Sequence, residues 1–179
     1  MLNYLQASTR PDLAFSVHQC ARFSQDPKLS HEQAVRRIGR YLLGTKERGI
    51  YYTPDKSKGI EVYVDAGFAG GWSNADADNP ENVLSRTGYV IQYANCPLVW
   101  SSKLQTEIAL STAESEYIAL SQAMREVIPL MNLMKEINEV LPLHLPEPKI
   151  HCKVFEDSTS CIAMATCNKF TPRTKHQSN

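Results

Sequence analysis

The sequence predicts an α/β protein whose central sheet combines an antiparallel three-strand meander with a parallel fourth strand. Two observations carry this prediction. Three strand-like apolar runs follow one another between residues 61 and 102, the last two joined by a short turn. A long helical pattern and a further apolar run come next, and a helical crossover favours a fourth strand parallel to the first. At 179 residues, the chain is long enough for one domain, alone or with a helical appendage.

The first part of the chain is predicted to be helical. Apolar residues recur at helical spacing after Pro11, and the preceding Ser8-Thr9 pair is the expected cap. A second helix is expected to begin at a capping box formed by Ser30 and Gln33.

The helical part is expected to end in a short strand over residues 49–53 and a turn over residues 55–59. After this turn, strand-like apolar runs replace the helical spacing of apolar residues. We therefore divide the chain into a helical segment, residues 1–56, and an α/β domain, residues 57–179.

The α/β domain is expected to contain four strands and two helices. A long helix should begin at Ser111 or Thr112, and Pro129 should kink or split it. The expected strands cover residues 61–66, 87–94, 97–102 and 149–155, with a hairpin turn at 95–97 and a last helix over 160–167. The expected buried stripe of the long helix consists of Tyr117, Leu120, Met124, Val127, Met131 and Met134.

Three acidic residues form the candidate site. Asp65 lies at the end of the first predicted strand, Asp157 follows the fourth, and Glu116 lies near the start of the long helix. Sites in such sheets form at the carboxyl ends of adjacent strands. Carboxylates from three distant segments are suited to divalent metal ions, and a pair of ions can hold the reacting oxygens of a phosphodiester. The order Asp, Glu, Asp therefore indicates nucleic-acid hydrolysis. Glu114 lies on another side of the helix, near its N-terminus, where the macrodipole favours an anion, so a structural role suits it better.

The charge distribution and the cysteine content narrow the classes of function and of binding site that fit the chain. The net charge is zero, yet residues 36–58 contain seven basic and two acidic residues, and the tail beyond Cys167 is basic. Basic flanks around an acidic centre suit phosphate contacts, although ordinary solvated helix faces would look the same. The five cysteines are widely spaced without a CxxC pair, which favours neither a disulfide framework nor a zinc site. We find no signal peptide and no membrane-spanning apolar run.

Several strings make a resemblance specific. They are TRPDLAFSVHQCARFSQDP with HEQAVRRIGRYLLGT, then YVDAGFAG, then SRTGYVIQYANCPLVWSSKLQTEIALSTAESEYIAL, and finally RTKH. In this order they resemble the ribonuclease H domain of a copia-type LTR-retrotransposon polyprotein, preceded by the end of its reverse transcriptase. The resemblance implies a ribonuclease H-like fold. It also implies a two-metal endonuclease that hydrolyses the RNA strand of RNA–DNA hybrids during reverse transcription.

Carried over by position, the resemblance makes Asp65, Glu116 and Asp157 the catalytic metal ligands, for two Mg²⁺ ions or alternatively Mn²⁺. The implied partners are an RNA–DNA hybrid and the remainder of the polyprotein, with no membrane. The implied location is a cytoplasmic retrotransposon particle or the nucleus, without secretion. Residues expected to contact nucleic acid are Arg36, Arg37, Arg40, Ser101, Ser102, Lys103, Gln105, Thr106 and Lys175.

The chain also departs from the family pattern. Gly67 stands where the family has a second Asp, and the loop over residues 70–85 is longer. After Lys175-His176 the family continues into a strand and a helix with a fourth acid, which we expect this chain to lack. A catalytically inactive remnant that at most binds nucleic acid is therefore the alternative. The absence of a Tyr-x-Asp-Asp motif excludes a polymerase, and the absence of a Glu after Asp157 argues against an integrase-like enzyme.

Overall fold

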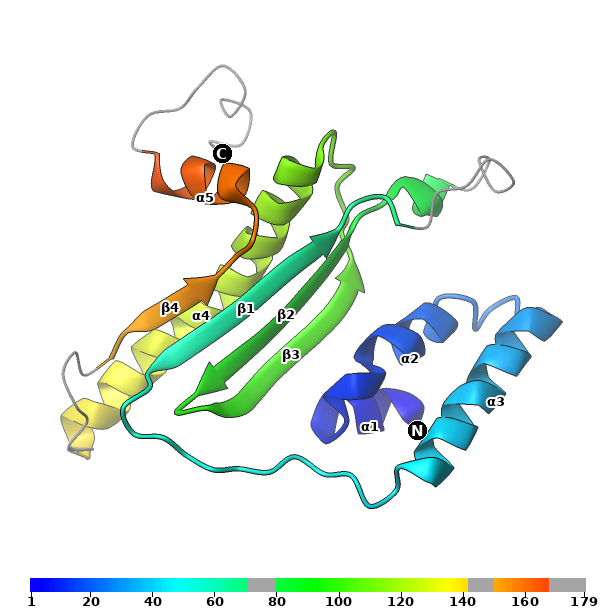
Figure 1. Ribbon diagram of the computed structural model, residues 1–179, viewed down its shortest axis with the longest axis horizontal. Coiled ribbons are helices and arrows are strands. Elements are labelled where there is room, and N and C mark those ends of the chain that lie inside the picture. Colours follow the sequence, from blue (N-terminus) through cyan, green and yellow to red (C-terminus); the bar gives the residue numbers. More distant parts are fainter. Residues whose placement is uncertain (71–79, 142–149, 168–179) are drawn as a thin grey trace.

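A four-stranded mixed sheet lies at the centre of the computed structural model, which describes residues 1–70, 80–141 and 150–167 (Figure 1). The strand order is β3-β2-β1-β4. β1 (Ile60–Gly67), β2 (Arg86–Tyr93) and β3 (Cys96–Leu104) form an antiparallel meander, and β4 (Cys152–Phe155) runs parallel to β1. This confirms the predicted α/β class and the parallel fourth strand, in agreement with a ribonuclease H-like fold.

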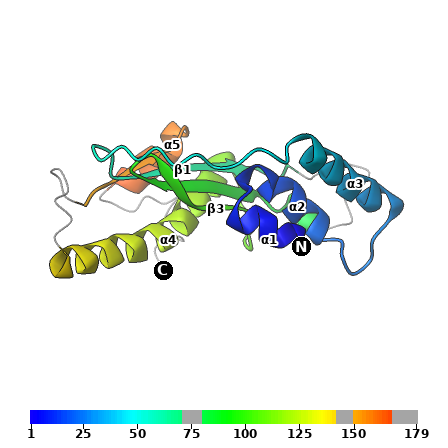
Figure 2. The same cartoon turned by 90° about the horizontal axis from the view of Figure 1, so that it is seen from below.

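The helices fall into two groups. The N-terminal group contains α1 (Leu2–Ser8), the 3₁₀ turn η1 (Pro11–Leu13), α2 (Ala14–Ala21) and α3 (Leu29–Gly44). The second group contains the short turn η3 (Pro80–Val83), the long α4 (Thr112–Val140) and α5 (Thr159–Thr166). α4 packs along the sheet, as Figure 2 shows, and Pro129 lies within it without splitting it. Within the described ranges, no helix combines the length and apolar character that a membrane span requires.

The main core lies between β1, β2 and α4. Alternate β1 residues, from Ile60 to Ala66, are buried together with Ile91 of β2, as the two-residue period of a strand requires. The buried line of α4 passes through Ala119, Ala123 and Val127, each with no exposed surface. Small alanine side chains allow the helix backbone to approach the sheet closely. Of the predicted stripe, Val127 and Met134 lie in this buried core, whereas Leu120, Met124 and Met131 are partly buried beside it. The same helix face places Ser115 and Glu116 in the protein interior.

The start of the β2–β3 turn and the position of Pro97 differ from the predictions. The β2–β3 hairpin turns at Ala94 and Asn95, which both have positive φ values (50° and 66°), so the turn predicted at residues 95–97 begins one residue earlier. Two consecutive positive φ values are typical of a type I′ hairpin. Pro97 instead lies in β3, an edge strand where a missing N–H is tolerated.

The strand predicted over residues 49–53 is wrong. These residues form no strand, and Tyr51 and Tyr52 are 85% and 57% exposed. Their aromatic, β-branched composition suits a strand, but none of the strands in the described ranges pairs with them. The predicted caps also differ: α3 begins at Leu29, where the Lys28 N–H donates to Nδ1 of His31 (3.0 Å), and the residues near Ser8 belong to α1, which was not predicted.

The N-terminal helices contact the edge strand β3. Nε1 of Trp100 donates to the Gln6 carbonyl oxygen at 2.6 Å, and α2 packs against β3. Arg86 of β2 contacts His18 Nδ1 (3.1 Å) and Gln19 Oε1 of α2. The division of the chain at residues 56 and 57 stays a prediction.

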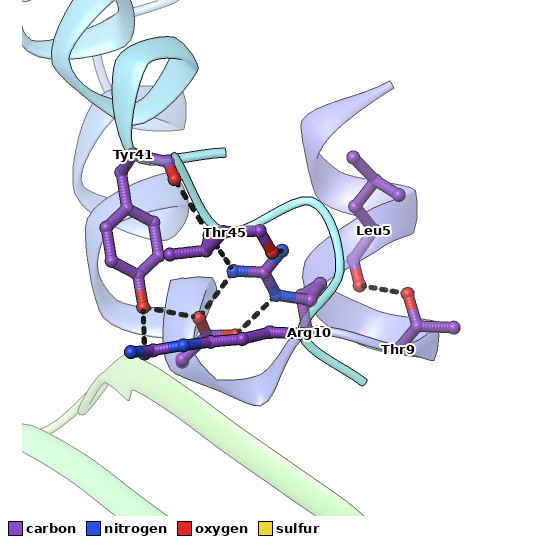
Figure 3. Close-up of polar contacts among 7 residues, drawn as sticks. Leu5, Thr9, Arg10, Tyr41 and Thr45 are labelled. Atoms are coloured by element: carbon purple, nitrogen blue, oxygen red, sulfur yellow. Dashed lines mark hydrogen bonds and ion pairs between the residues drawn. The ribbon is translucent and has the colours of Figure 1, made fainter. Parts of the chain in front are cut away.

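A polar network around Arg10 fixes the N-terminal helices to one another (Figure 3). Arg10 is 7% exposed and donates from Nε and Nη2 to the two carboxylate oxygens of Asp12 (3.0 and 2.8 Å). It also donates to Oγ1 and the carbonyl oxygen of Thr45 (2.8 and 3.2 Å), and the Tyr41 hydroxyl donates to Asp12 (2.8 Å). The Arg10 guanidinium holds the pKa of Asp12 below its usual value. The network therefore ties η1 to the C-terminal end of α3.

We expect Arg10→Ala to lower the stability of this helical group by about 2–3 kcal/mol, because a bidentate, partly buried ion pair is lost and Asp12 is left without its cation. Arg36→Ala is the matched control. Arg36 pairs with Glu32 (2.7 Å), but both side chains are more than half exposed, so its loss should cost under about 1 kcal/mol. Urea unfolding of both variants measures the difference, and equal losses would contradict the expectation.

Candidate metal centre

Three carboxylates from three separate elements meet at one end of the sheet. Asp65 lies near the carboxyl end of β1, Glu116 in the first turns of α4, and Asp157 two residues after β4 ends. One carboxylate oxygen from each lies within 4.8 Å of the other two. Parallel pairing of β1 with β4 causes this meeting, because Tyr63 is paired with Phe155 and both chains then run on in the same direction. The structure therefore brings together the three acids that the sequence singled out.

The start of α4 fixes the position of Glu116. Ser111 is the N-cap, and its hydroxyl accepts from the Glu114 N–H at 3.2 Å. The Glu114 carboxylate reaches back to the Leu110 N–H at 2.8 Å. This arrangement resembles a capping box, and it gives Glu114 a structural role at the helix start, in line with the preference of the macrodipole for an anion there. With its helix start fixed in this way, Glu116 is directed to the buried side.

Glu116 is a buried acid in an unfavourable electrostatic setting. It is 4% exposed, and its Oε2 has no hydrogen-bond partner among the described residues. Burial raises the pKa of Glu116 to about 7, and the neighbouring charges of Glu156, Asp65 and Asp157 act in the same direction, against a backbone hydrogen bond from Ala66. Buried polar atoms in folded proteins normally have a partner. An acid that is buried, surrounded by like charges and left with an unpaired oxygen is therefore suited to a cation.

Asp65 and Asp157 form the solvent side of the cluster, since both are exposed. Asp157 is directly followed by Ser158, whose hydroxyl accepts from the Cys161 N–H at 3.2 Å and caps α5. This cap fixes the start of α5, so Asp157 lies at the junction between strand and helix. The thiol of Cys161 lies behind the cluster, fully buried, where desolvation and the nearby acids raise its pKa to about 12.

Gln105 does not occupy the exposed position that was predicted for it. It was expected to contact nucleic acid, but it is 1% exposed, and its side-chain NH₂ is already used within the protein. Nε2 donates to Oγ1 of Thr87 in β2 (3.1 Å) and to the carbonyl oxygen of Ser115 in α4 (2.8 Å). Gln105 therefore supports the helix turn next to Glu116 and is inaccessible to an external strand.

The other candidates near β3 occupy different faces. Ser101, Ser102 and Lys103 lie within β3, which extends two residues beyond the predicted end at residue 102. Ser102 pairs with Gly88, which pairs with Asp65, so Ser102 is on the Asp65 side of the sheet at two strand spacings, roughly 10 Å. Gly88 places no side chain between them. Thr106 is exposed and donates to Glu107 at 2.8 Å.

The basic candidates lie elsewhere. Arg36, Arg37 and Arg40 are exposed on α3, which Figure 1 shows beyond α2 and away from the acidic cluster. The structure does not bring these three arginines to the acids. Lys175 lies outside the described residues. Their contacts with nucleic acid stay predictions.

The sequence analysis did not single out two residues near the site, Arg86 and Glu156. Arg86, at the start of β2, donates to the carbonyl oxygen and hydroxyl of Ser102 (3.3 and 3.4 Å). Glu156 raises the pKa of Glu116 more than either aspartate does. The sequence could have indicated Glu156, because this residue directly precedes Asp157 and consecutive residues of an extended chain point to opposite faces of a sheet.

Comparison with known proteins places this α/β protein with its carboxylate cluster in a family. The retrovirus-related Pol polyprotein from transposon TNT 1-94 of Nicotiana tabacum is 35% identical over 175 residues, covering 98% of this chain and 12% of the polyprotein. The corresponding polyprotein from transposon RE1 of Arabidopsis thaliana is 35% identical over 116 residues, covering 65% and 7%. Secreted RxLR effector protein 161 of Plasmopara viticola is 37% identical over 115 residues, covering 64% of this chain and 75% of that protein. No family model and no solved structure matches significantly.

The chain belongs to the retrovirus-related Pol polyproteins of Ty1/copia-type transposons, as the resemblance implied. It spans only 7–12% of the length of the polyproteins named above. It is therefore a retrotransposon polyprotein fragment.

Proposed function

We propose that this fragment is a ribonuclease H-type endonuclease that hydrolyses the RNA strand of RNA–DNA hybrids with two Mg²⁺ ions. The convergence of Asp65, Glu116 and Asp157 within 4.8 Å is the observation that carries the proposal. The proposed setting is reverse transcription by the polyprotein, in a cytoplasmic retrotransposon particle or in the nucleus.

The chemistry of the cluster fits the proposed cations. Its donors are all carboxylate oxygens, which are the ligands that Mg²⁺ and Mn²⁺ prefer in proteins. Oε2 of Glu116 gives a further fit, because a cation there would satisfy a buried atom that has no hydrogen-bond partner within the described part of the chain. A cation would also offset the repulsion among three neighbouring carboxylates.

The position of each site residue sets the role that it would have. Asp65, Glu116 and Asp157 would hold the ions, which supply Lewis-acid stabilisation and an activated water when bound. Glu116 forms the buried wall of the site, held by the Ser111 cap and by the Gln105 contact to Ser115. The two exposed aspartates leave the solvent side open for a phosphodiester.

Recognition of the hybrid would extend across the sheet from the acids. An RNA strand is distinguished by its 2′-hydroxyls in a wide, shallow minor groove. The Ser102 hydroxyl lies in the same cross-strand row as Asp65, with only Gly88 between them. Ser102 is therefore the best placed of the predicted contacts on β3.

Asp65→Asn tests the proposal. We expect the wild-type chain with Mg²⁺ to cleave a labelled RNA–DNA hybrid, and the variant to lose about 10²-fold or more in rate, because a neutral amide is a poor ligand for a hard cation. Asp65 is exposed and pairs through its backbone, so the variant should keep the fold. Circular dichroism checks this.

The alternative, an inactive remnant, predicts another outcome for the same experiment. A wild-type chain that cuts the hybrid no faster than Asp65→Asn would show that the fragment is not an enzyme. Double-stranded DNA is the substrate control, and its cleavage at the same rate would contradict the proposed preference for hybrids.

A further inference from the structure

Two buried carboxylate oxygens at the metal centre have no partner, and they belong to different residues. Oε2 of Glu116 and Oε2 of Glu156 are both buried without a hydrogen bond, among the described residues. The other oxygen of Glu156, Oε1, accepts from the Ser158 N–H at 3.1 Å. Glu156 is thus anchored through one oxygen while the other is left unsatisfied. Each such atom in a native structure requires an explanation, such as a bound ion.

Strand geometry places Glu156 on the side of the sheet that α4 covers. The last pair of the β1–β4 ladder is Tyr63 with Phe155, whose rings stack at 4.7 Å on the face opposite the core. The next residue of an extended chain serves the other face. Glu156 therefore belongs with the helix side, where Glu116 lies, and Asp157 returns to the side of Asp65. Glu156 is not part of the three-carboxylate group within 4.8 Å, so it does not share that cation position.

We propose that Glu156 and Glu116 form a second cation position, next to the one formed by Asp65, Glu116 and Asp157. Glu116 would contribute to both positions, and the two unsatisfied oxygens would face the same ion. This inference rests on the proposed function for the identity of the first position, and it adds Glu156 to the three acids as a ligand of the second ion. It assigns a fourth acid to the centre from within the described chain, at a residue next to Asp157.

Mn²⁺ titration of the full chain by calorimetry at pH 8, after chelation, tests this proposal without relying on catalysis. We expect two bound Mn²⁺ ions in the wild type and one in Glu156→Gln, with the remaining affinity changed by less than about threefold and the lost site weakened by roughly tenfold or more. Glutamine keeps an Oε1 acceptor for the Ser158 N–H, so the start of α5 should remain intact. Glu136→Gln, an exposed acid near the far end of α4, is the control and should bind like the wild type.

The outcomes separate the two proposals. Two ions in Glu156→Gln, or fewer than two in the wild type, would overturn the second position whatever the activity. Loss of one ion in this variant, together with a wild type that does not cleave hybrids, would support the second position and overturn the proposed function alone. Because the neutral amide would still satisfy a purely structural role, stoichiometry is a readout that such a role would not change.

Discussion

Glu116→Gln is expected to stabilise the cation-free protein at pH 8 and to remove its cation binding. The folded protein keeps a proton on Glu116 up to about pH 7, whereas the ordinary value of 4.5 applies to the unfolded chain. Between these values the native state binds more protons, so the free energy of unfolding falls as pH rises through this window. The full penalty, roughly 3 kcal/mol, is present above pH 7 and absent below pH 4.5.

Thermal melts in EDTA measure this effect. Glutamine carries no charge, so the Tm of the variant should exceed that of the wild type by about 5 °C at pH 8 and should match it at pH 4.5. Mg²⁺ should raise the wild-type Tm at pH 8, because a ligand that binds the native state stabilises it, and should leave the variant unchanged. Glu136→Gln is again the control, with no pH-dependent gain.

A lower Tm for Glu116→Gln at pH 8 would contradict this account, since it would mean that the carboxylate stabilises the fold by contacts of its own. The pKa of Glu156 is raised for the same reasons of burial and neighbouring acids. Both glutamates therefore lower the free energy of unfolding of the wild type as pH rises. Glu116→Gln should remove only the part of this decrease that Glu116 contributes.

The three-acid centre was predictable because it depends on few relationships. Asp65 lies near the end of one apolar strand and Asp157 follows another, and one inference, that these strands are parallel neighbours, brings both acids to the same edge. Glu116 needed only the helical pattern after Ser111. Each relationship is visible within one short segment, so local patterns were sufficient for the site.

Gln105 shows where local patterns fail. It follows a polar stretch of β3, which favours an exposed loop, but its burial depends on Thr87 and Ser115 from two other elements. Residues 49–53 fail for a related reason, because a strand needs a partner that their own composition does not reveal. Glu156 was overlooked because Asp157 satisfied the pattern, although the alternation after Phe155 indicated the helix side.

Gln105→Leu is expected to have the largest effect on the site among residues that contact neither cation nor substrate. Leucine fits a buried position but removes both Nε2 hydrogen bonds, which leaves Oγ1 of Thr87 and the Ser115 carbonyl oxygen without this donor. Each such loss costs about 1–3 kcal/mol, although removal of the unpaired Oε1 of Gln105 offsets part of it. We expect a net loss of roughly 2–3 kcal/mol by urea unfolding.

The same substitution should also weaken cation binding, because Ser115 directly precedes Glu116 and its carbonyl oxygen is the anchor of that helix turn to β3. Mn²⁺ affinity should fall by about tenfold, as happens when support of metal ligands is lost. Thr106→Ala, at the exposed neighbouring residue, is the control and should change neither quantity. A Gln105→Leu variant that loses stability but binds Mn²⁺ like the wild type would show that the position of Glu116 is fixed by the Ser111 cap and the core contacts of α4 alone.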